Sequence, residues 1–495
     1  MKIVVRGPVS RYELENLTRL FFADAGILPE GGSAHRLLTA GEETDCVLVR
    51  LSARQPLQKG AGMLAALRRG GKTVFVRGRL DDPVRAEYEL CRLLYGLLRQ
   101  VTGKRPPWGM LTGVRPVRLL HDGVRRGSTE EQVCRALREE YDVSEEKLSL
   151  ALQTARNQRR VLQEVLPQDY SLYVSIPFCP SRCSYCSFVS RTIEKSRALV
   201  QPYVETLCRE LAAISAQAAR LGLRLRTVYI GGGTPTSLSA QQLRTVMQCI
   251  RDFFPLEIAQ EYTVEAGRPD CTDEEKLAVI RQLGATRISI NPQTLQDSVL
   301  QHIGRRHSAQ DILDCYAAAR RVGHTNINMD LIAGLPSDTV SGFDDTLRRV
   351  LALRPENITV HTLTLKRASN LVVEEREESY DNVSAMLQSC RLVTENGYQP
   401  YYLYRQKGTL QNLENTGYCL PGYEGLYNIY IMEELHSIFS AGAGGVTKLK
   451  HADASPDAQS RKIERIFNYK YPLEYVRDFD AILEKKQEVD AFYGR

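Results

Sequence analysis

Short apolar runs alternate with longer amphipathic stretches from residue 172 onward. The short runs favour strands, whereas the longer stretches repeat their apolar residues every three or four positions, which favours helices. Six strand–helix units in a row predict a parallel sheet that curves into a partial barrel. The expected strands are 172–176, 227–231, 261–265, 287–290, 326–332 and 357–363.

Several helices in this region are preceded by recognisable capping residues. A Ser or Thr followed three residues later by an acidic or amide side chain satisfies free amides of the first helical turn. We therefore expect helices to begin at three such pairs. These are Ser239 with Gln242, Thr272 with Glu275, and Ser308 with Asp311.

The first 165 residues have a different order of elements. Strands are expected at 2–5, 46–51 and 73–77, with helices near 12–25 and 85–101. This order predicts a small α+β unit, although the order itself is common to many folds.

The segment 105–116 interrupts that pattern. It contains three prolines, and three glycines if Gly103 is counted, so it predicts a connector. Trp108, the single tryptophan, is expected to be a packing anchor there. A charged helical stretch over 129–166 then predicts a pair of linker helices.

The pattern divides the chain into three regions. Residues 1–165 form an accessory domain with a helical linker, 166–370 form the partial barrel, and 371–495 form a C-terminal α+β region rich in Tyr and Gly. We expect the last region to cover the mouth of the barrel. The predicted fold class is α/β, a partial (β/α)6 barrel with an accessory region on each side in the sequence.

Composition limits the environment of the chain. With 495 residues, 43% hydrophobic and 25% charged, more than one buried core is expected. No apolar stretch approaches the roughly 18 residues of a membrane span. The first residues lack an apolar signal core, so a cytoplasmic location is expected. The net charge of +6 is small, which argues against nucleic acid and suits an anionic small molecule.

Three of the twelve cysteines lie within eight residues, at Cys179, Cys183 and Cys186, and nine are scattered singly. Single cysteines without regular spacing are typical of a reducing compartment. A CxxxCxxC loop supplies three thiolates to a four-iron cluster and leaves one iron open for a ligand. The alternative is a structural zinc site that borrows a distant His or Cys as its fourth ligand.

Further polar and glycine residues follow the later strands. The turn 231–236, GGGTPT, lets a backbone approach a ligand closely, and it lacks the GK[ST] of a phosphate loop. Ligands of parallel sheets bind at the carboxyl ends of strands, where this turn and the cysteine loop fall. Polar side chains at or past other strand ends are Glu265, Gln293, Arg305 and Asp330.

The cysteine loop resembles that of the radical S-adenosylmethionine (SAM) superfamily. The flanking words YVSIPFC and YCSF resemble the oxygen-independent coproporphyrinogen III oxidase (coproporphyrinogen dehydrogenase) and haem chaperone group, most closely its HemZ-type branch. The resemblance implies a [4Fe–4S] cluster on the three cysteines. It also implies one SAM on the open iron, or two SAM molecules as in the related dehydrogenase.

The resemblance also implies which side chains contact SAM. Gly232, Gly233 and Thr234 would receive its amino group, and Tyr185 would exclude water beside Phe178 and Phe188. The remaining implied contacts are Tyr173, Glu265, Gln293, Arg305 and Asp330, with Thr364 matched by counting along the chain. No catalytic acid or base stands out in the sequence.

A tetrapyrrole with four propionates needs cations around an aromatic floor. The candidates are Lys366, Arg367, Arg405, Lys407, Arg115 and Arg118, beside Tyr401, Tyr402 and Tyr404. His307, His361 and His436 are candidate haem ligands or proton carriers, although single histidines are more often structural.

One position departs from the founding dehydrogenase. That family has a further cysteine where this chain has Phe188, a substitution shared with the haem chaperone branch. The resemblance implies oxidative decarboxylation of coproporphyrinogen III to protoporphyrinogen IX, with a low-potential electron donor such as flavodoxin or ferredoxin. A haem-binding chaperone, or another radical reaction on haem or a porphyrin, stays open.

Overall fold

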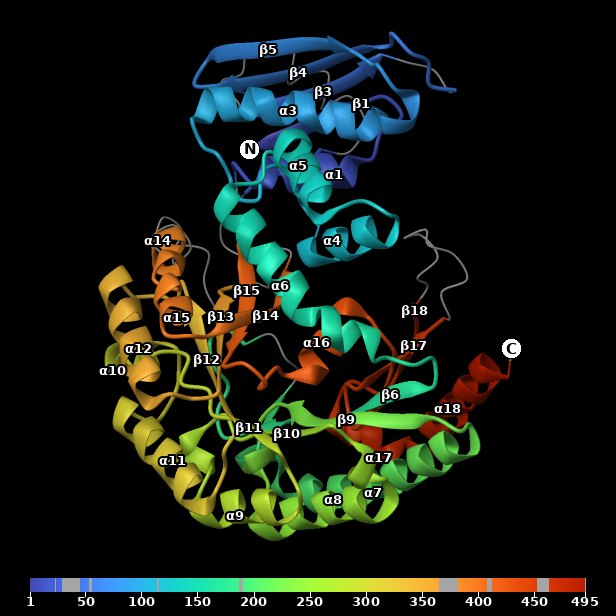
Figure 1. Ribbon diagram of the computed structural model, residues 1–495, viewed down its shortest axis with the longest axis vertical. Coiled ribbons are helices and arrows are strands. Elements are labelled where there is room, and N and C mark those ends of the chain that lie inside the picture. Colours follow the sequence, from blue (N-terminus) through green and yellow to red (C-terminus); the bar gives the residue numbers. More distant parts are fainter. Residues whose placement is uncertain are drawn as a thin grey trace. The chain divides into compact units, whose positions relative to one another are not determined.

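The computed structural model describes residues 1–22, 24–28, 45–52, 56–113, 115–186, 190–364, 382–406, 412–451 and 463–494 (Figure 1). The chain divides into two units. One is Met1–Pro116 with Ser128–Ser149, and the other is Val117–Gly127 with Leu150–Arg495.

The first unit contains a five-stranded sheet in the order β2-β1-β3-β4-β5. Buried Leu90, Leu94 and Leu98 of one helix pack with Val47 and Ala65 of the sheet in a shared core. The strands are β1 (Lys2–Arg6), β2 (Gly26–Ile27), β3 (Cys46–Ser52), β4 (Gly62–Arg69) and β5 (Lys72–Arg79), and the helices of this core are α1 (Arg11–Arg19) and α3 (Ala86–Thr102).

The predicted α+β unit is confirmed, with three differences. The helix expected over 12–25 ends at Arg19, and strands β2 and β4 were not predicted. The sequence of β4, GMLAALRR, consists largely of helix-favouring residues. It is nevertheless a strand because it pairs antiparallel along its whole length with β3 and β5.

The helical connectors agree with the predicted pair. They are α5 (Glu130–Tyr141) and α6 (Glu145–Gln163), and Trp108 is 2% exposed, as expected of a packing anchor. The short helix α4 (Pro116–Arg125) was not predicted. It begins at the last proline of the expected connector, where the first helical position needs no amide donor.

The second unit contains an eleven-stranded sheet whose centre is the predicted parallel barrel. Six strands follow in chain order, each parallel to the next. Their carboxyl ends therefore meet at one edge. These strands are β6 (Asp169–Ile176), β9 (Arg224–Gly232), β10 (Glu261–Glu265), β11 (Arg287–Ser289), β12 (Ile327–Ala333) and β13 (Asn357–Thr362).

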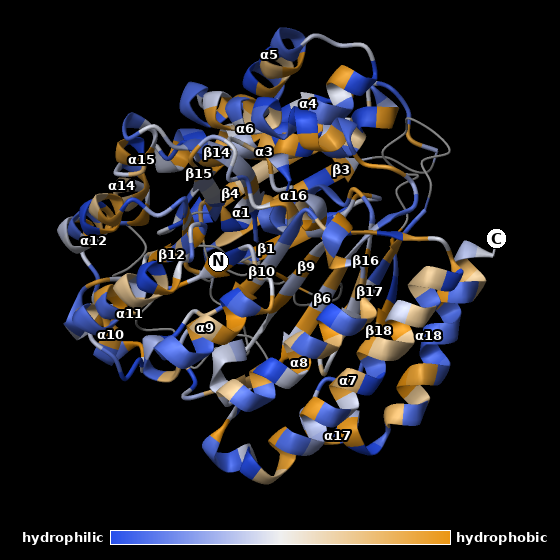
Figure 2. Cartoon of the chain, turned by 60° about the horizontal axis from the view of Figure 1, so that its bottom comes forward, coloured by the Kyte–Doolittle hydropathy of each residue, from blue (hydrophilic) through white to orange (hydrophobic). Residues whose placement is uncertain are grey.

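Helices follow the outer side of this curved sheet (Figure 1). Strands β6 and β9 are largely hydrophobic, whereas α7, α8 and α9 each carry hydrophobic and hydrophilic residues (Figure 2). That mixture is expected of helices with one buried face. The helices are α7 (Arg197–Arg220), α8 (Ala240–Phe253), α9 (Glu274–Gln282), α10 (Asp297–His302), α11 (Ala309–Val322) and α12 (Val340–Leu353).

Two of the three predicted capping boxes are confirmed, at the starts of α8 and α11. The third is wrong. Asp273, not Thr272, caps α9 by accepting a 2.8 Å hydrogen bond from the Lys276 amide. The Thr272 hydroxyl instead donates to Thr236 Oγ1 at 2.8 Å, so it serves a contact between two loops.

The C-terminal residues extend the sheet at both ends. Strands β14 (Gln399–Arg405) and β15 (Glu414–Cys419) are antiparallel additions beside β13. Strand β16 (Ser437–Ala441) lies parallel to β6, and β17 (Val446–Lys450) and β18 (Ile463–Phe467) complete that end. The core of the barrel therefore has a seventh parallel strand, β16, which was not predicted.

The remaining helices of this region are short except the last. They are α14 (Val383–Gln388), α15 (Arg391–Glu395), α16 (Leu426–Glu433), α17 (Pro472–Arg477) and α18 (Phe479–Tyr493).

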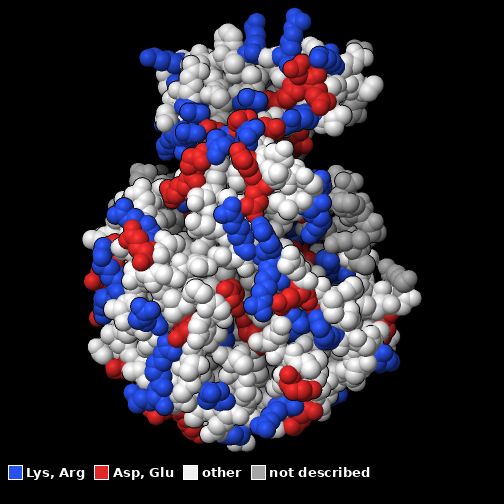
Figure 3. Space-filling model, viewed as in Figure 1, with Lys and Arg blue, Asp and Glu red and all other residues white. Residues whose placement is uncertain are grey.

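Surface charge and helix hydrophobicity were also compared with the predictions from the sequence. On the face drawn in Figure 3, basic and acidic side chains are interspersed, in keeping with the net charge of +6. Among the described residues, no helix has both the length and the apolar character that crossing a membrane requires.

Candidate functional site

A cavity of about 370 Å³ lies at the carboxyl ends of the parallel strands. Its walls come from the cysteine loop, the glycine turn, residues along β10 to β13, strands β14 and β15, and helix α16. The lining includes Cys179, Cys183 and Cys186, and most of the other predicted site residues: Tyr185, Gly232, Gly233, Thr234, Glu265, Gln293, Arg305, Asp330 and Thr364.

The cysteine loop begins in a small parallel sheet of β7 (Phe178–Cys179) and β8 (Arg191–Thr192). All three of its cysteines are free thiols. Thr234 Oγ1 donates to Cys179 Sγ at 3.6 Å. Within the described ranges no three Cys, His, Asp or Glu side chains already form a metal-ion site. The three cysteines nevertheless line one and the same cavity.

The glycine turn packs directly against this loop. The Gly233 amide donates to Ile176 O at 2.7 Å, and the Thr234 amide donates to Phe178 O at 2.7 Å. A Cβ on Gly233 would lie 2.5 Å from Phe178 O and 3.0 Å from Cys179 Sγ. Only glycine fits there, so the backbone of the turn packs directly against the first cysteine, and the Thr234 hydroxyl adds a side-chain contact to its sulfur.

Two carboxylates of the barrel strands have opposite electrostatic environments. Glu265 is the last residue of β10, as expected, whereas Asp330 lies in the middle of β12 and not at its end. Burial raises the pKa of Glu265 to about 7, against the lowering effect of a 2.6 Å hydrogen bond from Tyr229 Oη. Burial also acts to raise the pKa of Asp330, but His361 at 3.8 Å and Asn328 at 2.7 Å outweigh it, so the pKa is lowered. Asp330 is thus the charged member of the pair near neutral pH.

Arg305 and Tyr185 form one side of the cavity. Arg305 Nη2 donates to Tyr185 Oη at 3.3 Å, and Nη1 donates to Asn291 O at 2.7 Å. Arg305 Nε has no hydrogen-bond partner although the side chain is 7% exposed. A buried N–H of this kind is suited to a polar ligand.

Gln293 lies in an unusual backbone conformation. Its φ is +68°, which is strained for a residue with a side chain. The strain is sustained by β12, because the Gln293 amide donates to Asp330 O at 2.9 Å and its carbonyl accepts from the Ile332 amide at 3.0 Å. These contacts hold Gln293 against the cavity wall.

The two remaining predicted contacts are less central. Thr364 lines the cavity, and its hydroxyl donates to Thr362 O at 3.3 Å. Tyr173 is absent from the cavity lining among the described residues. Its ring lies 6.1 Å from the rings of Tyr229 and Tyr427, stacked with both.

Of the predicted tetrapyrrole contacts, Tyr402 and Tyr404 line the cavity, with ring centroids 6.0 Å apart. Arg405 and Arg118 do not line it in the described structure; Arg405 Nε donates to Asn412 O, and Arg118 pairs with Glu434. Arg115 belongs to the first unit. Phe188, Lys366, Arg367 and Lys407 lie outside the described residues.

The three candidate histidines are in different environments. His361 lines the cavity. His307 is buried beside Asp270, with its Nδ1 3.6 Å from Oδ1. His436 is hydrogen bonded to Ser171 Oγ at 2.8 Å, and burial lowers its pKa to about 3. His436 is therefore a neutral structural residue.

Sequence reasoning missed two arginines in the site. Arg287 is 1% exposed and lines the cavity, yet no carboxylate in the described chain lies within 4 Å of it. Its contacts are a 3.5 Å hydrogen bond to Asn357 Oδ1 and a partnerless Nε. An arginine opening an otherwise apolar strand was the available signal. Arg268, in the loop after β10, carried no such signal.

Comparison with known proteins now identifies the family. Residues 173–350 match the model of the radical SAM superfamily. The chain is 38% identical over 397 residues to "Oxygen-independent coproporphyrinogen-III oxidase-like protein HemZ" of Bacillus subtilis (strain 168), covering 79% of this chain and 78% of that protein. The chain belongs to the radical SAM superfamily, in its HemZ-type branch.

Other known proteins are also similar to this chain. It is 32% identical over 283 residues to "Heme chaperone HemW" of Bacillus subtilis (strain 168), covering 56% of this chain and 70% of that protein. A solved structure of coproporphyrinogen III oxidase (HemN) from Escherichia coli is 22% identical, with a TM-score of 0.49, covering 66% of this chain and 72% of that one.

Membership of the radical SAM superfamily implies a [4Fe–4S] cluster and SAM. The donor set fits, because three free thiols line one cavity and no fourth cysteine does so among the described residues. The cluster would be held by Cys179, Cys183 and Cys186.

Proposed function

We propose that the protein is an oxygen-independent coproporphyrinogen III dehydrogenase. In this reaction each of two propionates loses one hydrogen atom from its β carbon and its carboxyl group as carbon dioxide. One further electron passes to an acceptor, and a vinyl group remains. The similarity to the HemZ protein, over most of both chains, supports this reaction class.

The cofactors would supply the hard chemistry. When bound, the cluster and SAM provide a 5′-deoxyadenosyl radical, formed with an electron from a low-potential donor such as flavodoxin or ferredoxin. We propose that one SAM binds at the open iron, and a measurement of SAM bound per protein distinguishes one molecule from two. A cytoplasmic setting is part of the same proposal.

The chain's own residues would bind and orient SAM. We assign its amino group to the turn of Gly232, Gly233 and Thr234, and the exclusion of water to Tyr185. The complementary polar contacts would be Glu265, Gln293, Arg305, Asp330, Tyr173 and Thr364. An amine, a carboxylate and a ribose diol match this set of carboxylates, amide and guanidinium.

The buried Arg287 in the cavity is the observation that supports an anionic tetrapyrrole as the substrate. The Arg287 guanidinium is 1% exposed and forms no ion pair within 4 Å in the described chain. Burial acts to lower its pKa, but the nearby Tyr401, Glu261 and Asp330 outweigh burial and raise the pKa, so the charge is partly balanced within the protein. Its Nε still has no hydrogen-bond acceptor, and a ligand could complete it. A propionate carboxylate has the charge and the planar geometry to do so. The neighbouring Tyr402 and Tyr404 rings offer an apolar wall for the pyrrole rings.

The reaction can be tested with anaerobically reconstituted protein, reductant, SAM and coproporphyrinogen III. We expect carbon dioxide loss and vinyl products, detected by mass spectrometry, in step with 5′-deoxyadenosine. Formation of 5′-deoxyadenosine without vinyl product would reject the proposal.

Arg287→Gln tests the substrate contact. We expect the Kd for coproporphyrinogen III to rise about tenfold to a hundredfold, because a charge-assisted contact of about 1.5–3 kcal/mol is lost. Cluster content and SAM binding should stay unchanged. Arg321→Gln removes an exposed ion pair to Glu274 and serves as the control. Equal Kd values for both variants would show that Arg287 is structural.

A haem carrier is the second candidate. It is favoured by the similarity to the HemW chaperone and by Phe188 in the cysteine loop. Haem titration followed by absorbance separates the two functions. Tight stoichiometric haem binding without decarboxylation would favour the carrier, and a modified haem or porphyrin found by mass spectrometry would favour another radical reaction.

A further inference from the structure

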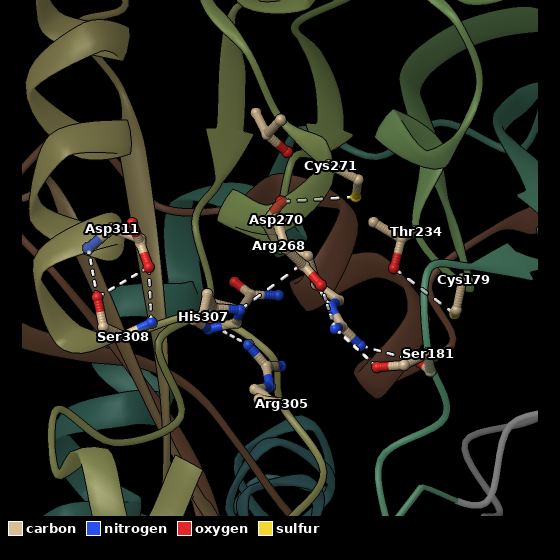
Figure 4. Close-up of polar contacts among 12 residues, drawn as sticks. Cys179, Ser181, Thr234, Arg268, Asp270, Cys271, Arg305, His307, Ser308 and Asp311 are labelled. Atoms are coloured by element: carbon tan, nitrogen blue, oxygen red, sulfur yellow. Dashed lines mark hydrogen bonds and ion pairs between the residues drawn. The ribbon is translucent and has the colours of Figure 1, made fainter. Parts of the chain in front are cut away.

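Arg268 reaches from the loop after β10 to the cysteine loop (Figure 4). Its Nη1 donates to Ser181 O at 2.9 Å, and its Nη2 donates to Ser181 Oγ at 2.9 Å. Ser181 lies between the first two cysteines of the CxxxCxxC loop. Arg268 thus holds the backbone that spaces Cys179 from Cys183.

The same guanidinium also approaches a sulfur. Arg268 Nη1 donates a hydrogen bond to Cys183 Sγ at 3.7 Å. Arg268 is 4% exposed and Cys183 is 8% exposed, so water screens this contact little.

Asp270 fixes the orientation of Arg268. Arg268 Nε donates to Asp270 Oδ1 at 2.9 Å, and Nη2 donates to Oδ2 at 2.6 Å, a fork-to-fork pair. On its other side Asp270 faces the buried His307, with Oδ1 3.6 Å from Nδ1 (Figure 4).

The geometry leaves Arg268 little freedom. An arginine has five N–H donors, and here four are directed to Asp270 and Ser181 oxygens. The fifth is directed to Cys183 Sγ. The contacts to the Asp270 and Ser181 oxygens are enough to fix the conformation of the loop. The additional contact to the Cys183 sulfur therefore indicates a second role for Arg268.

We propose that Arg268 is a positioning residue for the iron–sulfur cluster, which aligns the cysteine loop and raises the cluster's reduction potential through Cys183. Reduction adds a negative charge to the cluster, and a nearby buried cation and a hydrogen bond to a ligand sulfur stabilise that reduced form. The proposal depends on the cluster implied by the family and not on which tetrapyrrole the protein acts upon.

Arg268→Gln tests the proposal in anaerobically reconstituted full-length protein. The measurements are iron and sulfide content, circular dichroism and a redox titration followed by electron paramagnetic resonance. At a fixed potential we expect the ratio of reduced to oxidised cluster to fall about tenfold, equivalent to a midpoint about 59 mV lower. A midpoint equal to that of the unmodified protein, in a variant that folds and holds the cluster, would overturn the proposal.

Two milder variants decide the matter if Arg268→Gln does not retain a cluster. Arg268→Lys keeps the charge but cannot form the fork, and Asp270→Asn keeps the guanidinium but loosens its orientation. Both should give a lower midpoint, by less than the tenfold change, and unchanged midpoints in both would overturn the proposal. The exposed Arg321→Gln is the matched control and should leave the midpoint and the iron content unaltered.

Discussion

Glu265 has the clearest pH-dependent chemistry of the residues around the cavity. It is a carboxyl group whose pKa burial raises from an ordinary 4.5 to about 7, while Asp330 nearby stays charged. An acid that is half protonated near neutral pH responds to small changes around it. Binding of a cation or a hydrogen-bond donor beside Glu265 would lower its pKa and shift it back to the charged form.

Glu265→Gln should therefore alter the pH dependence of stability in the ligand-free protein. Between pH 4.5 and pH 7 the folded state binds more protons at Glu265 than the unfolded state, so the free energy of unfolding falls as pH rises through this window. The full difference is about 3 kcal/mol. Urea unfolding at pH 5 and pH 8 measures this pH dependence of the free energy of unfolding. The Glu265→Gln variant should lose the contribution of Glu265, whereas the exposed Glu205→Gln should keep it. Identical slopes in all three proteins would contradict the assignment.

Gly233 is expected to control how well the protein retains its iron–sulfur cluster. Gly233→Ala would push a methyl group against Phe178 O and Cys179 Sγ, at 2.5 and 3.0 Å before relaxation. We expect at least a tenfold loss of cluster retention, measured as iron per protein after gel filtration, because the first cysteine is displaced. The control is Gly96→Ala in α3, where an added Cβ meets nothing within 4 Å and should stabilise the helix by about 1 kcal/mol. Normal iron content in Gly233→Ala would contradict the close packing.

Among the elements, helix α9 shows how a helix start is selected. Thr272 and Asp273 are adjacent, and both are good capping residues. Tertiary contacts choose between them, because the Thr272 hydroxyl is already directed to Thr236. The amide of Lys276 is left to the carboxylate of Asp273.

Asp273→Ala should lower the free energy of unfolding by about 1 kcal/mol, the usual value of a helix cap. Asp273→Asn keeps a side-chain acceptor and should cost less than about 0.5 kcal/mol. Urea unfolding at neutral pH measures both. If Asn were as costly as Ala, the contribution would come from the charge of Asp273 and not from its cap.

Across the whole second unit, one carboxylate joins elements that are distant in the chain. Glu210 of α7 is fully buried and accepts hydrogen bonds from the Gly442 amide at 2.7 Å, Asn468 Nδ2 at 2.8 Å and Tyr475 Oη at 2.6 Å. Lys486 Nζ of α18 lies 2.9 Å from its Oε1. These contacts hold β16 and the C-terminal helices against the first helix of the barrel.

Glu210→Ala should lower the free energy of unfolding by about 3–5 kcal/mol, since it leaves the Lys486 ammonium buried without its partner. Glu205→Ala, on an exposed face of the same helix, should change it by less than about 0.5 kcal/mol. Thermal unfolding followed by circular dichroism compares the two. A small effect at Glu210 would mean that the C-terminal strands are held by backbone pairing alone.

The sequence by itself determined the properties that depend on local order. Cysteine spacing predicted the thiol loop, the alternation of apolar runs predicted six parallel strands, and the polar residues of those strands predicted the cavity lining at Glu265 and Asp330. Such patterns suffice because side-chain periodicity states which face of an element is buried. They also bring every strand end of a parallel sheet to one edge.

Only the tertiary structure decided which neighbour each buried face meets. The pairing of β16 with β6, the contact of Arg268 with Ser181, and the hydrogen bond of Arg287 to Asn357 all join segments far apart in the chain. The periodicity of apolar side chains does not predict which distant segments will be in contact. The energy of a buried charge is set by the groups that surround it after folding, and those groups come from separate parts of the sequence.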